Sequence, residues 1–282
     1  MIPFDFEYYR PEALKEAANL YKELIESGKE PVIFAGGTEI ITLGRLNEVK
    51  TGAVIDIKGI PECNTFGFKG DHLFTGASLR LTEIEEINLF PLLSKTVSEI
   101  ADRTARNKIT AGGNICGQTF YREAVLPFLL TDSEMMIAHS RGIRNVPIHD
   151  IFKGRLMLKP GEFLVGIKTH KKYLHVPFES IKRRRQWDTG YPLLTAAAVK
   201  AEGRIRIAIS GLTDFPFRAF QLEEALGSRG AGMEERLAEA VRSLNVQVLD
   251  DSEGSSEYRL FVLRNILSDI AEKLGGETGE GI

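Results

Sequence analysis

The order of apolar and polar positions predicts a chain of alternating helices and strands. Between Pro11 and Gly28, apolar residues recur at helical spacing, which predicts a helix that starts at the proline and ends at the glycine. Short apolar runs predict buried strands at Val32–Phe34 and Val54–Ile57. The same reasoning predicts strands at Thr65–Phe68, His72–Ala77, Glu134–Ala138 and Phe163–Thr169, and helices at Leu81–Asn88, Pro91–Ala105 and Ala124–Leu130.

The pattern changes near residue 170. Strands are predicted at Phe178–Lys182, Thr195–Ala201 and Arg204–Ser210, and the alternating Arg and Ile of the last one are typical of a half-exposed antiparallel strand. Helices are predicted at Ala219–Leu226, Met233–Val241 and Ser256–Leu274. The sequence therefore predicts an α+β protein with two domains, 1–172 and 173–282, the second built of antiparallel sheet plus helices.

Composition excludes several classes of protein. With 36 basic and 39 acidic residues the net charge is −3, which does not suit a protein that coats nucleic acid. The longest apolar run, about Ala124–Leu130, is far shorter than the ~20 residues of a membrane span. The N-terminus lacks the pattern of a secretion signal, and two isolated cysteines without a CxxC fit a reducing cytoplasm. No metal site is expected, because the five histidines show no HExxH spacing and two cysteines cannot hold a four-thiolate cluster.

Two glycine turns carry the candidate chemistry. The first turn is Ala35, Gly36, Gly37, Thr38, Glu39 and Ile40, and the second turn is Thr110, Ala111, Gly112, Gly113 and Asn114. Glycine allows positive φ and lets a ligand approach the backbone, and successive N–H groups in such a turn can converge on an anion. Together the turns could hold a diphosphate without an adjacent Lys or Arg. A single Gly-Gly after a strand is ordinarily only a turn, and neither segment matches GxGxxG or the P-loop.

An ordered set of segments resembles one known family. The opening MIPFDFEYYRPEALKEA is followed by AGGTEI, VIDIKGI, TAGGNICG, GEFLVGIKT, FESIKRRR and TAAAV. This set resembles the FAD-binding (medium) subunits of molybdenum hydroxylases, such as the carbon monoxide dehydrogenase flavoprotein, and the flavin domain of xanthine dehydrogenases. The resemblance covers nearly the whole chain.

The resemblance implies both a fold and a function. The fold would be a two-lobed FAD-binding domain like that of vanillyl-alcohol oxidase, followed by a carbon monoxide dehydrogenase flavoprotein-like C-terminal domain. The function would be electron transfer by an oxidoreductase subunit with no acid–base residues of its own, because the flavin carries the reactivity. The implied partners are a large molybdopterin subunit and a small 2Fe–2S subunit, and NAD is one of several open acceptors.

The resemblance also implies roles for individual residues. The two turns would hold the FAD diphosphate and flank the ribityl chain, and the strand Val32, Ile33 and Phe34 would lie along the cofactor. Four further residues have implied roles: Ile100 as an apolar contact, Leu164 near the adenine, Lys182 near the flavin, and Glu123 at the position of the family's aspartate. Here Glu123 is one methylene longer than that aspartate, and no proline precedes it. Tyr191 or Trp187 would stack on the flavin.

Some residues and functions keep two interpretations. The cations Lys182–Arg185 are either a solvated strand end or a group that acts at the flavin or at a partner, and Cys116 is expected to be a packing residue. The whole chain could instead be a self-sufficient FAD oxidoreductase, or a scaffold without flavin. The sequence does not identify the substrate, the final acceptor or the stoichiometry of the complex.

Overall fold

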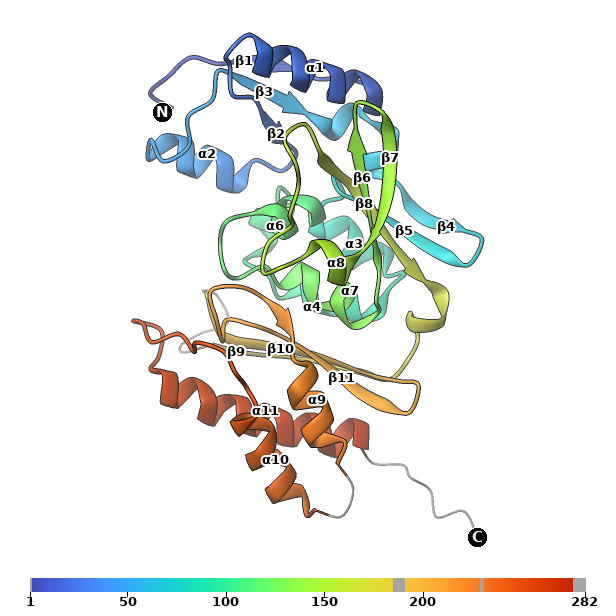
Figure 1. The fold of residues 1–282 in the computed structure, drawn as a ribbon, viewed down its shortest axis with the longest axis vertical. Helices are drawn as coiled ribbons and strands as arrows, with labels where there is room; N and C mark the ends of the chain where they lie inside the picture. The colour runs from blue at the N-terminus through green and yellow to red at the C-terminus, as the bar shows by residue number, and fades with distance from the viewer. Residues whose placement is uncertain (1, 185–190, 229–230, 276–282) are drawn as a thin grey trace. The chain divides into compact units, whose positions relative to one another are not determined.

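The computed structural model describes residues 2–184, 191–228 and 231–275. The chain forms two compact units (Figure 1). Unit 1 comprises the residues up to Leu89, Asp102–Gly117 and Asp132–Lys171. Unit 2 comprises Phe90–Ala101, Gln118–Thr131 and the described residues from Lys172 onward. The predicted domain boundary near residue 172 stays a prediction, and two short earlier segments group with the C-terminal unit.

Unit 1 begins with a small parallel sheet in the order β1-β3-β2, formed by Glu7–Tyr9, Ala53–Asp56 and Val32–Phe34. Helix α1 (Leu14–Glu26) connects β1 to β2, and helix α2 (Thr38–Arg45) connects β2 to β3. The two connections run in opposite directions across the sheet. Because such crossovers are almost always right-handed, the helices lie on opposite faces, as Figure 1 shows.

Unit 1 continues with an antiparallel sheet in the order β4-β5-β8-β6-β7. The central strand β8 (Phe163–His170) is almost wholly buried, as expected for a strand covered on both faces. The other strands are β4 Phe66–Lys69, β5 His72–Gly76, β6 Glu134–His139 and β7 Gly142–Pro147. Short helices complete the unit: η1 Ile57–Gly59, η2 Pro61–Asn64, α3 Leu81–Ile87, α5 Arg103–Arg106, α6 Ala111–Cys116 and α8 Ile148–Ile151.

Unit 2 is a three-layer arrangement around an antiparallel sheet in the order β12-β11-β10-β9. Its strands are β9 Phe178–Arg184, β10 Pro192–Ala201, β11 Arg204–Ser210 and β12 Phe217–Arg218. One face packs against α9 Phe220–Leu226, α10 Met233–Arg242 and α11 Ser256–Gly275 through the apolar core of the unit. The other face packs against α4 Pro91–Ser98 and α7 Leu126–Leu130 (Figure 1). The short helix η3 Glu123–Val125 contacts both α4 and α7, and η4 Lys171–Tyr173 precedes the sheet.

The predicted α+β class is confirmed, and the differences from the predicted elements are local. The single helix predicted at Pro91–Ala105 is wrong: α4 and α5 are separate, because Ala101 adopts a φ of 49° and the Asp102 side chain caps α5 by accepting from the Ala105 N–H. Helix α2 was not predicted, and the second glycine turn is the first turn of α6. Over the described residues, no helix combines the length and apolar character needed to cross a membrane.

Candidate functional site

The first glycine turn joins β2 to the start of α2. Gly37 is the N-cap residue of α2 and adopts a left-handed φ of 74°, with no side chain to cap the helix. A Cβ atom added to Gly37 would overlap the Phe34 ring. No described residue accepts a hydrogen bond from the N–H groups of Gly36, Gly37 or Thr38. Free N–H groups at a helix N-terminus favour an anion, so this turn has the polarity of an anion site.

The second glycine turn has the same kind of sequence but different hydrogen bonding. The N–H groups of Ala111 and Gly112 donate to the carbonyls of Leu79 (2.9 Å) and Ala77 (2.8 Å). The next two N–H groups, of Gly113 and Asn114, donate to the Thr110 hydroxyl (3.1 Å) and carbonyl (2.9 Å), as in a capped helix start. These four N–H groups therefore already have acceptors within the protein, unlike those of the first turn, and the predicted anion binding by the second turn stays a prediction.

The structure brings the two turns together. A Cβ atom added to Gly36 would overlap the carbonyl oxygen of Lys108 and lie 3.1 Å from the backbone nitrogen of Thr110. The Glu39 carboxylate of α2 also reaches Gly117, where an added Cβ would lie 2.5 Å from Oε2. Glycine at position 36 is thus needed for the close contact between the two turns. The hypothesis that both turns hold one diphosphate requires such a contact.

A polar network that the sequence analysis missed supports the first turn. Lys58 Nζ donates to the Ala35 carbonyl (2.7 Å), pairs with Asp56 Oδ2 (2.8 Å) and lies 4.4 Å from the centre of the Phe34 ring. Tyr8 also donates to Asp56 Oδ2 (2.5 Å), and this hydrogen bond raises the pKa of the Tyr8 hydroxyl. Asp56 was the one sign of this network in the sequence. An aspartate at the end of an apolar strand is expected to be buried, and a buried carboxylate needs a hydrogen-bonding or charged partner.

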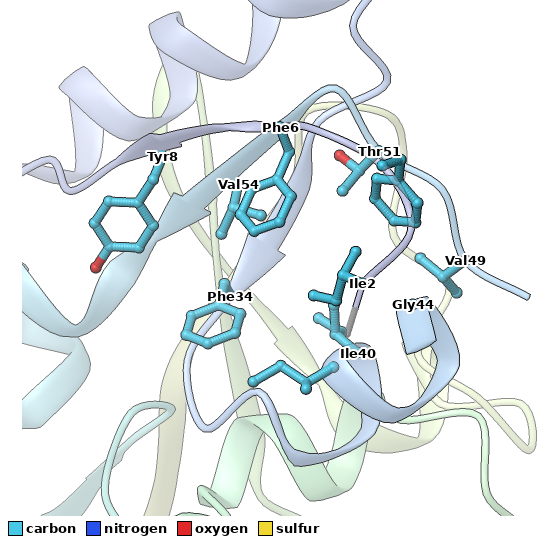
Figure 2. Close-up of a pocket in the computed structure, with 11 residues that line it drawn as sticks. Ile2, Phe6, Tyr8, Phe34, Ile40, Gly44, Val49, Thr51 and Val54 are labelled. Atoms are coloured by element: carbon cyan, nitrogen blue, oxygen red, sulfur yellow. The ribbon is translucent and has the colours of Figure 1, made fainter. Parts of the chain in front are cut away.

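An apolar pocket of about 230 Å³ lies behind the first turn, between the small sheet and α2. Figure 2 shows Phe34 and Ile40 on one side of it and Phe6 and Val54 on the other. The Tyr8 hydroxyl points away from these side chains, and the Thr51 hydroxyl bonds to backbone carbonyls of Glu30 and Ala53. The pocket therefore offers no polar group suited to a phosphate, and the anion-binding features belong to the turn.

Two further predicted residues meet inside unit 2. Lys182 Nζ lies 2.6 Å from Glu123 Oε1 and donates to the Glu99 carbonyl (2.7 Å), while the Thr195 hydroxyl donates to the same Glu123 oxygen (3.3 Å). The Lys182 and Glu123 side chains are 3% and 2% exposed. A buried lysine and glutamate compensate each other only when paired, so the fold brings together two residues that are distant in sequence. Their roles at the cofactor stay predictions.

The remaining predicted residues are found in both units. Ile100 follows Glu99 in unit 2, Leu164 pairs with Ile137 in unit 1, and both Ile100 and Leu164 are buried. Tyr191 is exposed and stacks on Tyr121, with ring centres 5.0 Å apart and planes 21° apart.

Trp187 and Arg185 lie outside the described residues. Of the two cysteines, Cys116 is exposed and Cys63 is buried, and burial raises the pKa of the Cys63 thiol to about 12.

Comparison with known families identifies the class of protein. Residues 4–169 match the family described as the FAD binding domain in molybdopterin dehydrogenase. The chain belongs to this family. FAD is accordingly its cofactor, and the chain is a flavoprotein subunit of the molybdenum hydroxylase type of oxidoreductase.

Individual relatives agree with this family. The chain is 27% identical to caffeine dehydrogenase subunit beta of Pseudomonas sp. (strain CBB1), covering 91% of this chain and 89% of the relative. It is also 27% identical to the carbon monoxide dehydrogenase medium chain of Hydrogenophaga pseudoflava, covering 77% and 78%. Both relatives are named as parts of larger dehydrogenases.

Solved structures confirm the fold. A carbon monoxide dehydrogenase from Hydrogenophaga pseudoflava that lacks the Mo-pyranopterin moiety superimposes with a TM-score of 0.86 at 24% identity, covering 98% of this chain and 99% of that chain. Quinoline 2-oxidoreductase from Pseudomonas putida 86 gives a TM-score of 0.83 at 24% identity, covering 98% and 99%. The α+β fold predicted from the resemblance is therefore correct.

Proposed function

We propose that this chain holds FAD with its diphosphate at the first glycine turn and transfers electrons within a three-subunit dehydrogenase. A large molybdopterin subunit would oxidise the substrate, and a small 2Fe–2S subunit would deliver the electrons to this chain. An external acceptor, with NAD as one candidate, would receive them. The caffeine and carbon monoxide dehydrogenase relatives, each named as one subunit or chain of a dehydrogenase, support this role.

The observation that carries the proposal is the set of free N–H groups at Gly36, Gly37 and Thr38. A diphosphate is an anion, and it would satisfy donors that no described residue satisfies. Gly37 adopts a left-handed φ and a Cβ atom added there would overlap the Phe34 ring, so glycine is required to keep these N–H groups where they lie.

The second turn would contribute by its shape. Gly112 packs against Ala77, but a Cβ atom added to Gly113 meets only the Thr110 hydroxyl, at 2.8 Å. Gly113 therefore has a more open surface than Gly112, and a ligand could lie against its Cα. In this proposal that surface is held in place by the hydrogen bonds of its neighbours Thr110, Ala111, Gly112 and Asn114.

Lys182 and Glu123 would lie near the flavin, as the resemblance implies. The Lys182 ammonium has three N–H donors, and within the described residues Glu123 and the Glu99 carbonyl accept two of them. The third would be directed to the cofactor, with Glu123 fixing its orientation in place of the family's aspartate. Tyr191 offers the ring face that Tyr121 does not cover, while Ile100 and Leu164 would flank the cofactor. FAD supplies the redox chemistry when bound, and the protein binds, orients and shields it.

The cellular setting is part of the same proposal. We place the complex in the cytoplasm, because an unpaired buried thiol such as Cys63 is usual in a reducing compartment. The chain would work as one member of a hetero-oligomer.

Two variants of the full chain test the cofactor site. We expect the purified wild type to be yellow and to release FAD rather than FMN on denaturation. Gly37→Val and Gly113→Val should each remove FAD binding, measured by quenching of flavin fluorescence. Valine at position 37 overlaps the Phe34 ring and displaces the first turn, and valine at position 113 covers the surface that is proposed to face the cofactor. Full FAD affinity in both variants would contradict the proposed diphosphate site.

Isolation of the complex tests the relay. Affinity purification from the native host should recover a molybdopterin subunit and a 2Fe–2S subunit with this chain. If the chain is always isolated alone, and a small organic substrate bleaches its flavin without partners, it is a self-sufficient oxidoreductase instead.

A further inference from the structure

The Ala35 carbonyl has a fixed direction because Lys58 holds it. Lys58 Nζ donates to this oxygen at 2.7 Å and is itself held by Asp56 Oδ2 at 2.8 Å. The Asp56 carboxylate is 2% exposed and also accepts from the Tyr8 hydroxyl and the Lys58 N–H. The buried Asp56 carboxylate therefore holds the Lys58 ammonium group in place.

The direction of this carbonyl determines the direction of the next N–H group. The Ala35–Gly36 peptide is trans, so the carbonyl of Ala35 and the N–H of Gly36 point in opposite directions. Because the carbonyl faces Lys58, the Gly36 N–H faces away from Lys58. This is one of the N–H groups that no described residue accepts.

We propose that Lys58 is a positioning residue for cofactor binding: by holding the Ala35 carbonyl, it keeps the Gly36 N–H directed at the diphosphate. This inference rests on the proposed function, which places the diphosphate at the first turn. Without Lys58 the carbonyl has no donor in the described chain, and glycine at position 36 lets the peptide rotate at little cost. The rotated peptide presents an oxygen to an anion in place of a donor.

This role differs from simple attraction between charges. The Lys58 charge is already paired with Asp56, so its field at the turn is largely cancelled. Lys108 provides the matched comparison, because its backbone contacts Gly36 while its exposed side chain has no interaction with Ala35. A charge effect would involve both lysines, whereas a positioning effect involves Lys58 alone.

The test compares FAD affinity in four variants of the full chain. We expect Lys58→Met to weaken FAD binding about tenfold, the usual effect of one lost hydrogen bond in a charged site. Lys58→Arg retains a donor and should restore binding to within about threefold of wild type. Lys108→Met should bind like wild type, and the ratio of Lys58→Met to wild type should not change between low and high salt.

Asp56→Asn separates positioning from stability. This variant removes the charge partner of Lys58 but leaves its donor to Ala35, so it should lose thermal stability without the full loss of affinity seen in Lys58→Met. The FAD-free melting temperature of each variant provides the comparison. If affinity simply follows melting temperature across the four variants, Lys58 has only a structural role and the proposal is overturned.

A spectroscopic signal reports the peptide directly. Carbonyl-¹³C alanine with ¹⁵N-glycine selects the Ala–Gly peptides, which in this chain end at Gly36, Gly112 and Gly232. We expect Lys58→Met to shift or broaden the Gly36 amide signal in FAD-free protein, while the Gly112 amide, bonded to Ala77, stays unchanged.

Three further results would overturn the proposal: an unchanged Gly36 signal, FAD affinity of Lys58→Met within about twofold of wild type, or an equal loss in Lys108→Met. The proposed function is tested separately, because Gly37→Val must lose FAD binding whatever Lys58 does. If Gly37→Val loses FAD binding and Lys58→Met binds FAD like wild type, the proposed diphosphate site stands and only the role of Lys58 is disproved. FAD binding retained in both Gly37→Val and Gly113→Val removes the site itself.

Discussion

The two glycine turns of unit 1 are alike in sequence and opposite in hydrogen bonding. Each has adjacent glycines followed by a small polar residue. In the first turn the N–H groups of Gly36 and Gly37 have no acceptor among the described residues, and in the second the N–H groups of Gly112 and Gly113 are bonded within the protein. A Gly-Gly pair therefore indicates where the backbone is accessible, but its surroundings decide whether the N–H groups are available to a ligand.

The N-cap residues of the two helices explain much of the difference. Thr110 is the N-cap residue of α6 and its hydroxyl caps the helix, whereas Gly37 is the N-cap residue of α2 and has no side chain to cap it. The second turn also lies against a neighbouring segment, since Arg80 and Thr110 form an antiparallel bridge. The first turn follows β2, an edge strand of a three-stranded sheet, and forms no such bridge within the described part of the chain.

The largest expected effect is that of Gly37→Val in the first turn. Valine is strained at a φ of 74°, and its Cβ would overlap the Phe34 ring, so α2 must start differently. We expect FAD affinity to fall about 100-fold or more, because several donors to one anion are lost together. Titration of the FAD-free chain with FAD, followed by fluorescence quenching, measures this loss.

Gly70→Val is the matched control for backbone strain. Gly70 also has a positive φ, 61°, but a Cβ added there meets no atom within 4 Å. The control should lose about 1–2 kcal/mol of stability and retain FAD binding. Equal loss of FAD binding in both variants would mean that general destabilisation, not the first turn, controls affinity.

The sequence predicted the turns well and their hydrogen bonding poorly, for a physical reason. Strand β2 and the glycines could be recognised from a short apolar run that stops at Gly36. The acceptors for the Ala111 and Gly112 N–H groups come from Ala77 and Leu79, more than thirty residues earlier, which no local pattern reveals. Lys58 was missed for the same reason, since its partner Ala35 is distant in sequence.

The paired residues of unit 2 teach a related lesson. Periodicity alone gave no reason to connect Glu123 with Lys182, and only the family resemblance assigned both to one site. Glu123 in η3 meets Lys182 and Thr195 on the sheet, and this meeting depends on the tertiary fold. Trp187 remains a prediction outside the described residues, so the choice between it and Tyr191 stays open.

A smaller effect is expected from Gly112→Ala in the second turn. The added Cβ would lie 2.6 Å from the Ala77 Cβ and 2.8 Å from the Ala77 carbonyl oxygen, so α6 must move away from β5. Overpacking of this kind costs about 1–3 kcal/mol, which urea unfolding of the FAD-free chain would measure. An unchanged midpoint would show that α6 can move away from Ala77 without loss of stability.

The Thr110 cap should contribute about 1 kcal/mol. Thr110→Val keeps the shape of the buried side chain but removes the hydroxyl that accepts from the Gly113 N–H and caps α6. Thr110→Ser keeps the hydroxyl and should unfold close to wild type. If the valine variant binds FAD more tightly than wild type, the released N–H has become a ligand donor, and the second turn then resembles the first.

The smallest effect concerns Cys116, which is exposed in α6 three residues after Gly113 and so lies on the same side of the helix. If FAD lies against Gly113, bound FAD should slow alkylation of Cys116 by about threefold, a modest shielding of an exposed side chain.

Cys63 is the internal control, because a pKa of about 12 leaves only about one thiol in ten thousand ionised at pH 8. Its labelling should begin only as the pH rises toward 12. Mass spectrometry of iodoacetamide-treated protein distinguishes the two cysteines. A Cys116 rate that does not respond to FAD would restrict the cofactor contact in unit 1 to the first turn.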